Sequence, residues 1–248
     1  MQTAPLPKPA LPAAHPPDPV RHAEDARARL LAEGLKLFSR QGYKKTSTRQ
    51  LAVAARVNIA SISYYFGDKA GLYRAVFAAA NGPPEEHVAL FGGSHLTLEQ
   101  ALQGFYAGFL EPLRQGDTAR LCMKLHFREM LEPTGLWDSQ LAQAVKPIHD
   151  ALMALLRRHL GLRAADAADA ADADADAIDS DLHRLAICLA GLGVQMHVCL
   201  DVNEHLLPGI SDGAEAIDRW SDRLVMFGLA MVQAEARSRG LVLAGDRL

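Results

Sequence analysis

Apolar residues recur at helical spacing along most of the chain. Leu31, Leu35 and Phe38 are separated by four and three positions, so they share one face of a helix of about residues 21–40 that Gly42 ends. Segments with the same periodicity follow at about residues 97–114, 117–131, 137–160, 180–203 and 213–239, and Pro147 is expected to kink or split the third. No segment alternates between apolar and polar positions long enough to indicate a sheet. The pattern therefore predicts an all-α protein.

Three short helices are predicted between residues 47 and 80. Ser47 and Gln50 form an S-x-x-Q capping box, which begins a helix that ends at a turn of residues 57–58. The next helix covers about residues 59–66, and another runs over about residues 69–80. Two short helices joined by a tight turn are the arrangement of a helix-turn-helix motif, in which the later helix enters the major groove of DNA.

Two segments are predicted to be disordered, and one boundary separates two folded parts. Residues 1–19 hold seven of the 13 prolines and no apolar signal-peptide core, which indicates a disordered tail over residues 1–20. Residues 164–181, with the sequence AADAADAADADADAIDSD, lack an apolar stripe and are expected to form a disordered acidic loop. The Asn-Gly-Pro-Pro sequence of residues 81–84 divides a domain of residues 21–80 from one of residues 85–248.

The net charge of −3 hides an uneven distribution of charge. Residues 20–80 carry 11 Lys and Arg against four acids, a balance of +7, whereas residues 81–248 carry 14 against 24, a balance of −10. A basic first part on an acidic remainder indicates that only the first part contacts a polyanion. Chance clustering of surface charge is the alternative explanation.

The predicted helix of residues 59–66 has two contrasting faces. Ile62 and Phe66 fall together on a helical wheel and are expected to point inward with Val57. The opposite face carries Ala60, Ser61, Tyr64 and Tyr65, with Ile59 and Ser63 at its border. Because no carboxylate occurs from Val57 to Gly67, phosphates would not repel this face, and its hydroxyl and apolar groups suit the major groove. Packing against neighbouring helices is the alternative role for each tyrosine.

Further DNA contacts are predicted at the first residues of two helices. Ser47 and Thr48 place hydroxyl and N–H groups at a helix N-terminus, where they bind a phosphate or simply cap the helix. Arg49 is expected to contact a base or the adjacent phosphate, with a solvated surface position as the alternative. Lys69 places a cation unfavourably near the N-terminus of the last short helix, which a phosphate partner would explain, with a tolerated surface lysine as the alternative. The predicted DNA-binding residues are Ser47, Thr48, Arg49, Ile59, Ala60, Ser61, Ser63, Tyr64, Tyr65 and Lys69.

These residues lie within a recognisable pattern. The sequence LLAEGLKLFSRQGY (residues 30–43), followed by TSTRQLAVAARVNIASISYYFGDKAGL (residues 46–72), resembles the TetR, or tetracycline-repressor-like, family of bacterial regulators. The sequence FREMLEPTGLWDSQLAQAVKPIHDALMALL (residues 127–156) is similar to the CecR-like branch of that family. The resemblance implies an all-helical homodimer with N-terminal helix-turn-helix DNA-binding domains and C-terminal domains that bind a small-molecule ligand and form the dimer.

The C-terminal part offers candidate groups for a ligand pocket and for a dimer interface. Polar or polarizable side chains on otherwise apolar segments could line a pocket, although core packing is the alternative for each; they are His126, Glu129, Trp137, His149, Met196 and His197. Ala190, Gly191 and Gly193 would allow close approach of a second helix, so this segment and residues 220–231 are the candidate dimer interface. A helix packed inside one chain is the alternative.

Other classes of protein are poorly supported. The sequence contains no GxSxG, HExxH, P-loop or Rossmann motif and no metal-ligand spacing, so we expect no enzymatic activity, cofactor or metal. Cys122, Cys188 and Cys199 are an odd number without a CxxC pair, which fits reduced thiols in the cytoplasm. The longest apolar stretch, about residues 185–200, is too short and too polar to span a membrane.

The sequence thus predicts a ligand-responsive transcriptional repressor that binds a palindromic operator as a homodimer and is released by a small-molecule effector. The alternative hypothesis is a helical module that senses a small molecule or binds a partner and whose DNA-binding part is inactive. The excess of positive charge in residues 20–80 argues against that alternative, because an inactive DNA-binding part has no need of it.

Overall fold

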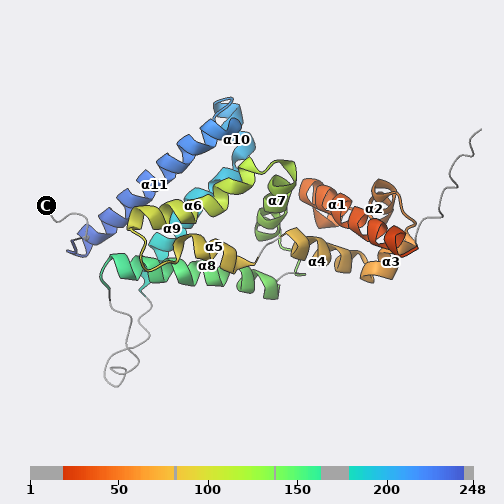
Figure 1. Cartoon of the computed structure of the whole chain (residues 1–248), viewed down its shortest axis with the longest axis horizontal. Coiled ribbons are helices and arrows are strands. Elements are labelled where there is room, and N and C mark those ends of the chain that lie inside the picture. Colours follow the sequence, from red (N-terminus) through yellow and green to blue (C-terminus); the bar gives the residue numbers. More distant parts are fainter. Residues whose placement is uncertain (1–18, 81–82, 137, 163–178, 243–248) are drawn as a thin grey trace, which may run out of the picture.

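The computed structural model describes residues 19–80, 83–136, 138–162 and 179–242, and within these ranges the regular structure is entirely α-helical (Figure 1). The helices are α1 (Pro19–Lys45), α2 (Thr48–Ala55), α3 (Ala60–Phe66), α4 (Lys69–Ala80), α5 (Pro84–Phe91), α6 (Leu98–Arg114), α7 (Asp117–Leu131), α8 (Asp138–His159), α9 (Ser180–Val198), α10 (Leu200–Leu206) and α11 (Gly213–Ser238). The prediction of an all-α fold is confirmed.

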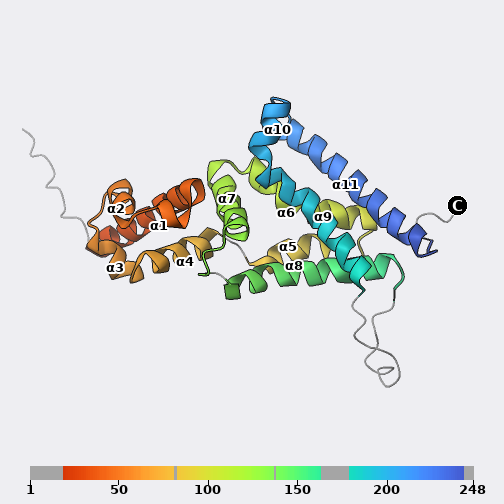
Figure 2. The same ribbon diagram turned by 180° about the vertical axis from the view of Figure 1, so that it is seen from behind.

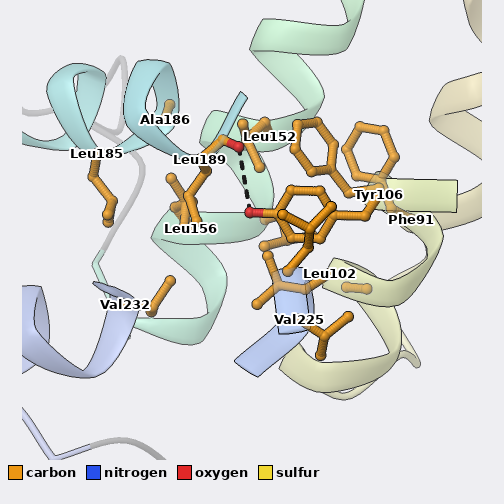
Figure 3. Packing of buried hydrophobic residues seen from close by; sticks show 14 of the residues in the cluster. Phe91, Leu102, Tyr106, Leu152, Leu156, Leu185, Ala186, Leu189, Val225 and Val232 are labelled. Carbon is orange, nitrogen blue, oxygen red and sulfur yellow. Dashed lines mark hydrogen bonds between the residues drawn. The ribbon is translucent and has the colours of Figure 1, made fainter. Parts of the chain in front are cut away.

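Two hydrophobic clusters divide the helices into two groups. Helices α1–α4, which we call the head, enclose the first cluster. Helices α5, α6 and α8–α11 enclose the second, and together with α7 we call them the body (Figures 1 and 2). In the body, α6, α8, α9 and α11 pack around Tyr106, whose hydroxyl donates a hydrogen bond to the carbonyl of Leu189 over 3.3 Å (Figure 3). Helix α7 lies between the two groups and contributes its buried Leu125 to the cluster of the head.

The local signals of the head produced the expected helices, with one correction. The capping box is present: the Ser47 hydroxyl accepts from the Gln50 N–H over 3.1 Å, and the Gln50 side chain accepts from the Ser47 N–H over 2.9 Å. Helix α4 has the predicted bounds. Helix α1, however, begins earlier than expected and resumes beyond Gly42, which bends the chain at a positive φ of 80° before a last turn that ends at Lys45.

The body contains a helix that the periodicity did not predict. Helix α5 has Pro84 in its first turn, followed by two glutamates that the helix dipole favours at that end. It packs closely on α6 because Gly104 and Gly108 carry no side chain: a Cβ atom would lie 2.0 Å from the Leu90 carbonyl oxygen at the first and 2.0 Å from the His87 ring at the second. These two glycines therefore set the α5–α6 distance.

Three other expectations for the body need correction. The segment predicted as one helix over residues 180–203 is two helices, α9 and α10, which are bent by 73° at Cys199. Residues 179–181 belong to α9 and its N-cap, not to the acidic loop: the Asp179 carboxylate caps the helix by accepting from the Leu182 N–H over 2.9 Å. Helix α8 continues through Pro147 as one helix, so of the predicted kink or split the split does not occur. The remainder of the predicted acidic loop and most of the predicted N-terminal tail lie outside the described residues.

No single described helix is long and apolar enough to cross a membrane. Helices α9 and α10 satisfy the criteria of length and composition only when taken together across their bend.

Candidate nucleic-acid interface and the head–body junction

A tight turn sets α3 across α2. The backbone at Arg56 has a left-handed φ of 54°. The N–H groups of Arg56 and Val57 donate hydrogen bonds to carbonyls of α2 over 3.1 and 3.0 Å. The Asn58 side chain then accepts from the Ala60 N–H over 2.9 Å and so caps the start of α3. Buried Leu51 and Ile62 hold the two helices to the core of the head, which fixes the outward face of α3.

The outward face of α3 has the composition that the helical wheel predicted. Ile62 is 2% exposed, whereas Tyr64 is 81% and Ile59 is 51% exposed. Ala60 and Ser63 are also exposed, and Ser61 and Tyr65 are half-buried. The rings of Tyr64 and Tyr65 meet edge to face, with centroids 4.8 Å apart. The face therefore presents one exposed aromatic side chain, one half-buried aromatic side chain, and small or hydroxylated groups around them.

The N-terminus of α2 lies at the surface beside this motif. Ser47 and Arg49 are exposed and Thr48 is half-buried. The Ser47 hydroxyl caps the helix, but it keeps the capacity to donate a hydrogen bond, and the first N–H groups of any helix lack intrahelical partners. Lys44 and Lys45, also exposed, precede the same helix and add positive charge that the site prediction did not include. Their adjacency to the capping box in sequence was the signal that could have identified them.

Lys69 has partners inside the head. Its ammonium donates to the carbonyls of Tyr43 and Thr46 over 3.1 and 3.0 Å and lies 4.1 Å from the centre of the Tyr43 ring. The carbonyls at the end of α1 thus explain a cation at the N-terminus of α4 without a phosphate. A phosphate contact by Lys69 stays a prediction.

The candidate ligand residues do not gather in one cavity. Glu129 is 3% exposed and accepts from the Tyr73 hydroxyl over 2.6 Å and from the Thr134 N–H and hydroxyl over 2.8 and 2.7 Å. Burial and the bond to Glu129 raise the pKa of Tyr73, so the phenol stays protonated and donates. Glu129 therefore joins α7 to α4 and to the residues after α7, and its prediction as a ligand contact has no support from its surroundings.

Two of the candidate histidines contact the Phe127 ring. His197 stacks on this ring and its Nε2 lies 2.7 Å from the Phe109 carbonyl, while His126 meets Phe127 edge to face and stacks on Phe77. Burial lowers the pKa of His197, and burial together with nearby His197 lowers the pKa of His126 to about 4. Both rings are neutral at pH 7.

The remaining candidates are dispersed. His149 on α8 pairs with His183 on α9, with Nε2 and Nδ1 2.9 Å apart. Met196 is 1% exposed in the core of the body. Trp137 lies outside the described residues.

A cleft of about 440 Å³ lies at the junction of head and body. Of the candidate ligand residues that the structure describes, the cleft includes His197 alone. Arg120, Lys124 and Arg128 line it from α7, and Arg40 lines it from the end of α1. The i, i+4, i+8 spacing of the three α7 cations was visible in the sequence, but a solvated helix face has the same spacing.

Comparison with known proteins decides the family. A sequence model of the C-terminal domain of the HTH-type transcriptional dual regulator CecR matches residues 98–232, and one of the bacterial regulatory proteins of the tetR family matches residues 30–76. The chain belongs to the TetR family, in its CecR-like branch. It is a TetR-family transcriptional regulator, as the resemblance implied.

Relatives and solved structures agree with this assignment. The chain is 32% identical over 154 residues to the dual regulator CecR of Shigella flexneri, an alignment that covers 58% of this chain and 68% of CecR. It is 30% identical over 113 residues to AcrR of the same organism, an alignment that covers 44% of this chain and 51% of AcrR. A TetR-family protein from Rhodococcus RHA1 superposes with a TM-score of 0.58 at 14% identity, covering 84% of this chain and 96% of its own. NalD of Pseudomonas aeruginosa superposes with a TM-score of 0.53 at 17% identity, and the superposition covers 89% of this chain and 98% of NalD. These structures share the fold.

Proposed function

We propose that this TetR-family regulator is a repressor that binds a palindromic operator as a homodimer and is released by a small-molecule effector. Residues 21–80 form its DNA-binding domain, and residues 85–248 bind the effector and form the dimer. The observation that carries the proposal is the outward face of α3, which exposes Tyr64 and small polar groups and includes no carboxylate from Val57 to Gly67. A helix with such a face, set across a capped helix, suits the major groove.

The expected contacts divide by chemistry. Ser47, Thr48 and the first N–H groups of α2 bind a phosphate, which orients the head on the duplex. Arg49 contacts a base or the phosphate next to it. The exposed residues of α3 meet base edges and phosphates: Ile59, Ala60, Ser61, Ser63, Tyr64 and Tyr65. Specificity then depends on Arg49 and α3, because phosphate contacts carry no sequence information directly.

The homodimer is supported by exposed apolar groups on α9 and α11. Ile187 on α9 is 62% exposed, and Met226 and Phe227 on α11 are 43% and 37% exposed. Gly191 faces open space, so the α9 backbone is accessible to a second helix there. Gly193 does not take part as expected, because the Phe109 ring covers it: a Cβ atom would lie 2.6 Å from that ring. The proposed interface is therefore the surface around Ile187, Gly191 and Phe227.

The proposal is tested by selecting bound fragments from the DNA of the source organism. A dimeric repressor should enrich a sequence with two inverted half-sites about one helical turn or somewhat more apart. Binding to that sequence is measured by fluorescence anisotropy. If Arg49 contacts a base, Arg49→Ala should weaken the binding free energy by about 1–3 kcal/mol per head. Lys36→Ala is the matched control, because Lys36 is a head cation that is already paired with Glu33 at 2.7 Å. Failure to enrich any sequence would favour the alternative, a sensing module with an inactive head.

A further inference from the structure

The cleft at the head–body junction is built from both parts of the molecule. It is lined by residues of α1, α6, α7, α9 and α10, in addition to Glu132 directly after α7. A volume of about 440 Å³ lies within the range of small-molecule sites. The core of the body is formed by the buried side chains of its cluster (Figure 3). The cleft is therefore the place to consider for a ligand that affects the head.

The cations of the cleft outnumber the acids that balance them. Arg128 is paired with Glu132 at 3.0 Å. Among the described residues, Arg40, Arg120 and Lys124 form no ion pair, although Asp117 and Asp201 also line the cleft. Asp117 lies in the first turn of α7, where the helix dipole favours a carboxylate without a cation. Three cations thus face two acids, and one of those acids is stabilised independently.

One of these cations is already held in position. The Arg120 guanidinium donates twice to the Leu113 carbonyl, over 3.3 and 3.0 Å. A carbonyl orients the guanidinium but does not neutralise it, so its charge remains available to an anion. Lys124 follows one turn later on the same face of α7.

The remaining wall of the cleft is apolar. It consists of Leu113, Leu121, Phe127, Leu131, Val198 and Leu200. Leu131 is 66% and Val198 is 41% exposed, so apolar surface remains uncovered there. His197, stacked on Phe127 and bonded to the Phe109 carbonyl, is neutral and adds a flat ring to this wall. A ligand that satisfies both walls has one anionic group and an apolar part.

We propose that this cleft binds a small amphiphilic monoanion, a carboxylate or sulfonate with an attached apolar group. The anion lies among Arg40, Arg120 and Lys124, and the apolar part covers Phe127 and the neighbouring aliphatic side chains. The inference deepens the proposed function by naming the chemical class of the effector, and it rests on that function only for the effect on DNA.

The position of the cleft gives the ligand a route to the head. Arg128 donates to the Arg40 carbonyl over 3.4 Å, and its guanidinium lies against Gly42, where α1 bends. An anion that attracts the Arg40 and Arg128 side chains acts at this contact between α7 and α1. A ligand that favours one position of the head over another changes operator affinity by the ratio of its own affinities for the two positions.

A pair of fluorescent probes tests the site. The anion 8-anilinonaphthalene-1-sulfonate and the uncharged N-phenyl-1-naphthylamine share their rings and differ in the sulfonate. The full-length protein should bind one sulfonate probe per chain, and Arg40→Gln and Lys124→Gln should each weaken that binding about tenfold by removing a charge-assisted hydrogen bond. Binding of the uncharged probe should stay within about twofold. Lys146→Gln, which removes an exposed cation of α8 outside the cleft, should affect neither probe.

Each outcome has a defined meaning. Equal affinities of the sulfonate probe for the wild type, Arg40→Gln and Lys124→Gln would overturn the proposed anion site, whatever the DNA result. Charge-dependent binding to a protein that enriches no DNA would support the site and contradict the proposed function instead. If both hold, the sulfonate probe should shift operator affinity at least threefold in the wild type, and the Lys124→Gln variant should require about tenfold more probe for the same shift. Saturation of the cleft without any shift would overturn its assignment to the effector.

Discussion

The phenol of Tyr73 in the head donates a 2.6 Å hydrogen bond to the carboxylate of Glu129 in the body, and both side chains are almost fully buried. This bond crosses the boundary between α4 and α7. Together with Leu125, which α7 inserts into the core of the head, it shows that the head is attached by more than the chain that follows α4. A movement of the head must therefore alter the packing of α7, and α7 also lines the proposed effector cleft.

Removing the hydroxyl in Tyr73→Phe should destabilise the protein by about 1–3 kcal/mol, because Glu129 then remains buried with one donor fewer. Tyr106→Phe is the matched control. Its buried hydroxyl donates to a neutral carbonyl over 3.3 Å, so its loss should cost only about 0.5–1.5 kcal/mol. Chemical denaturation measures both variants. Equal losses of unfolding free energy in the two variants would show that the Tyr73–Glu129 bond stabilises the protein no more than a hydrogen bond to a neutral carbonyl.

Stability should fall as the pH decreases from about 6.5 to 4, because the folded protein holds His126 neutral. Its pKa is lowered from 6.5 to about 4 by burial and by His197, so over this range the unfolded chain binds a proton that the folded chain does not. The contribution of His126 is fully present above pH 6.5 and is lost as the pH falls through about 4, with a magnitude of roughly 3 kcal/mol.

The measurement is the slope of unfolding free energy against pH for the wild type and for His126→Phe, which keeps a ring beside Phe77. His87, whose pKa is also lowered by burial, contributes to the slope in both proteins, so the difference reports His126 together with its coupling to His197. Asp179 does not interfere, because its pKa is lowered to about 2 by Arg239 and its effect occurs below this range. Identical slopes would refute the assignment.

Features that depend on residues close together in the sequence could be predicted from it, whereas features that depend on residues far apart could not. The α2 capping box, the acid-free face of α3 and the bounds of α4 depend on residues within one or two turns, and these were predicted. Helix α5 was missed because, unlike α2, it has no capping box: it begins at Pro84, directly after Pro83, without a side-chain cap, and this proline pair indicates a boundary between domains. The Tyr73–Glu129 bond joins residues 56 positions apart, and no local pattern indicates it. The cleft was missed for the same reason, since Arg40 reaches it only through the packing of α1 on α7.

The proposed dimer interface predicts opposite results for two similar substitutions. Ile187→Glu places a carboxylate on the exposed face of α9 and should dissociate the dimer, because a charge at the centre of an apolar interface must be desolvated. Leu206→Glu alters an even more exposed leucine on α10, outside that face, and should leave the dimer intact. Sedimentation velocity reports the oligomeric state of each variant. A dimeric Ile187→Glu protein would place the interface elsewhere.

The last prediction separates the two head cations that were assigned to DNA. Lys69 holds the Tyr43 and Thr46 carbonyls, so Lys69→Ala should destabilise the protein by about 1–3 kcal/mol. Arg49 is exposed and forms no ion pair among the described residues, so Arg49→Ala should change stability by less than about 0.5 kcal/mol. Thermal unfolding without DNA gives both values.

Operator binding over a range of salt concentrations then identifies phosphate contacts. Each phosphate that is neutralised contributes about −0.9 to the slope of log affinity against log salt. If Lys69 serves only the fold, Lys69→Ala measured well below its unfolding temperature should keep the wild-type slope, whereas loss of a phosphate contact would make the slope shallower by about one unit per head. Arg49→Ala should relax the preference at one position of each half-site if Arg49 contacts a base, and should reduce the slope without that relaxation if it contacts a phosphate. A stable Lys69→Ala protein with a shallower slope would restore Lys69 to the DNA interface and show that its carbonyl contacts are secondary.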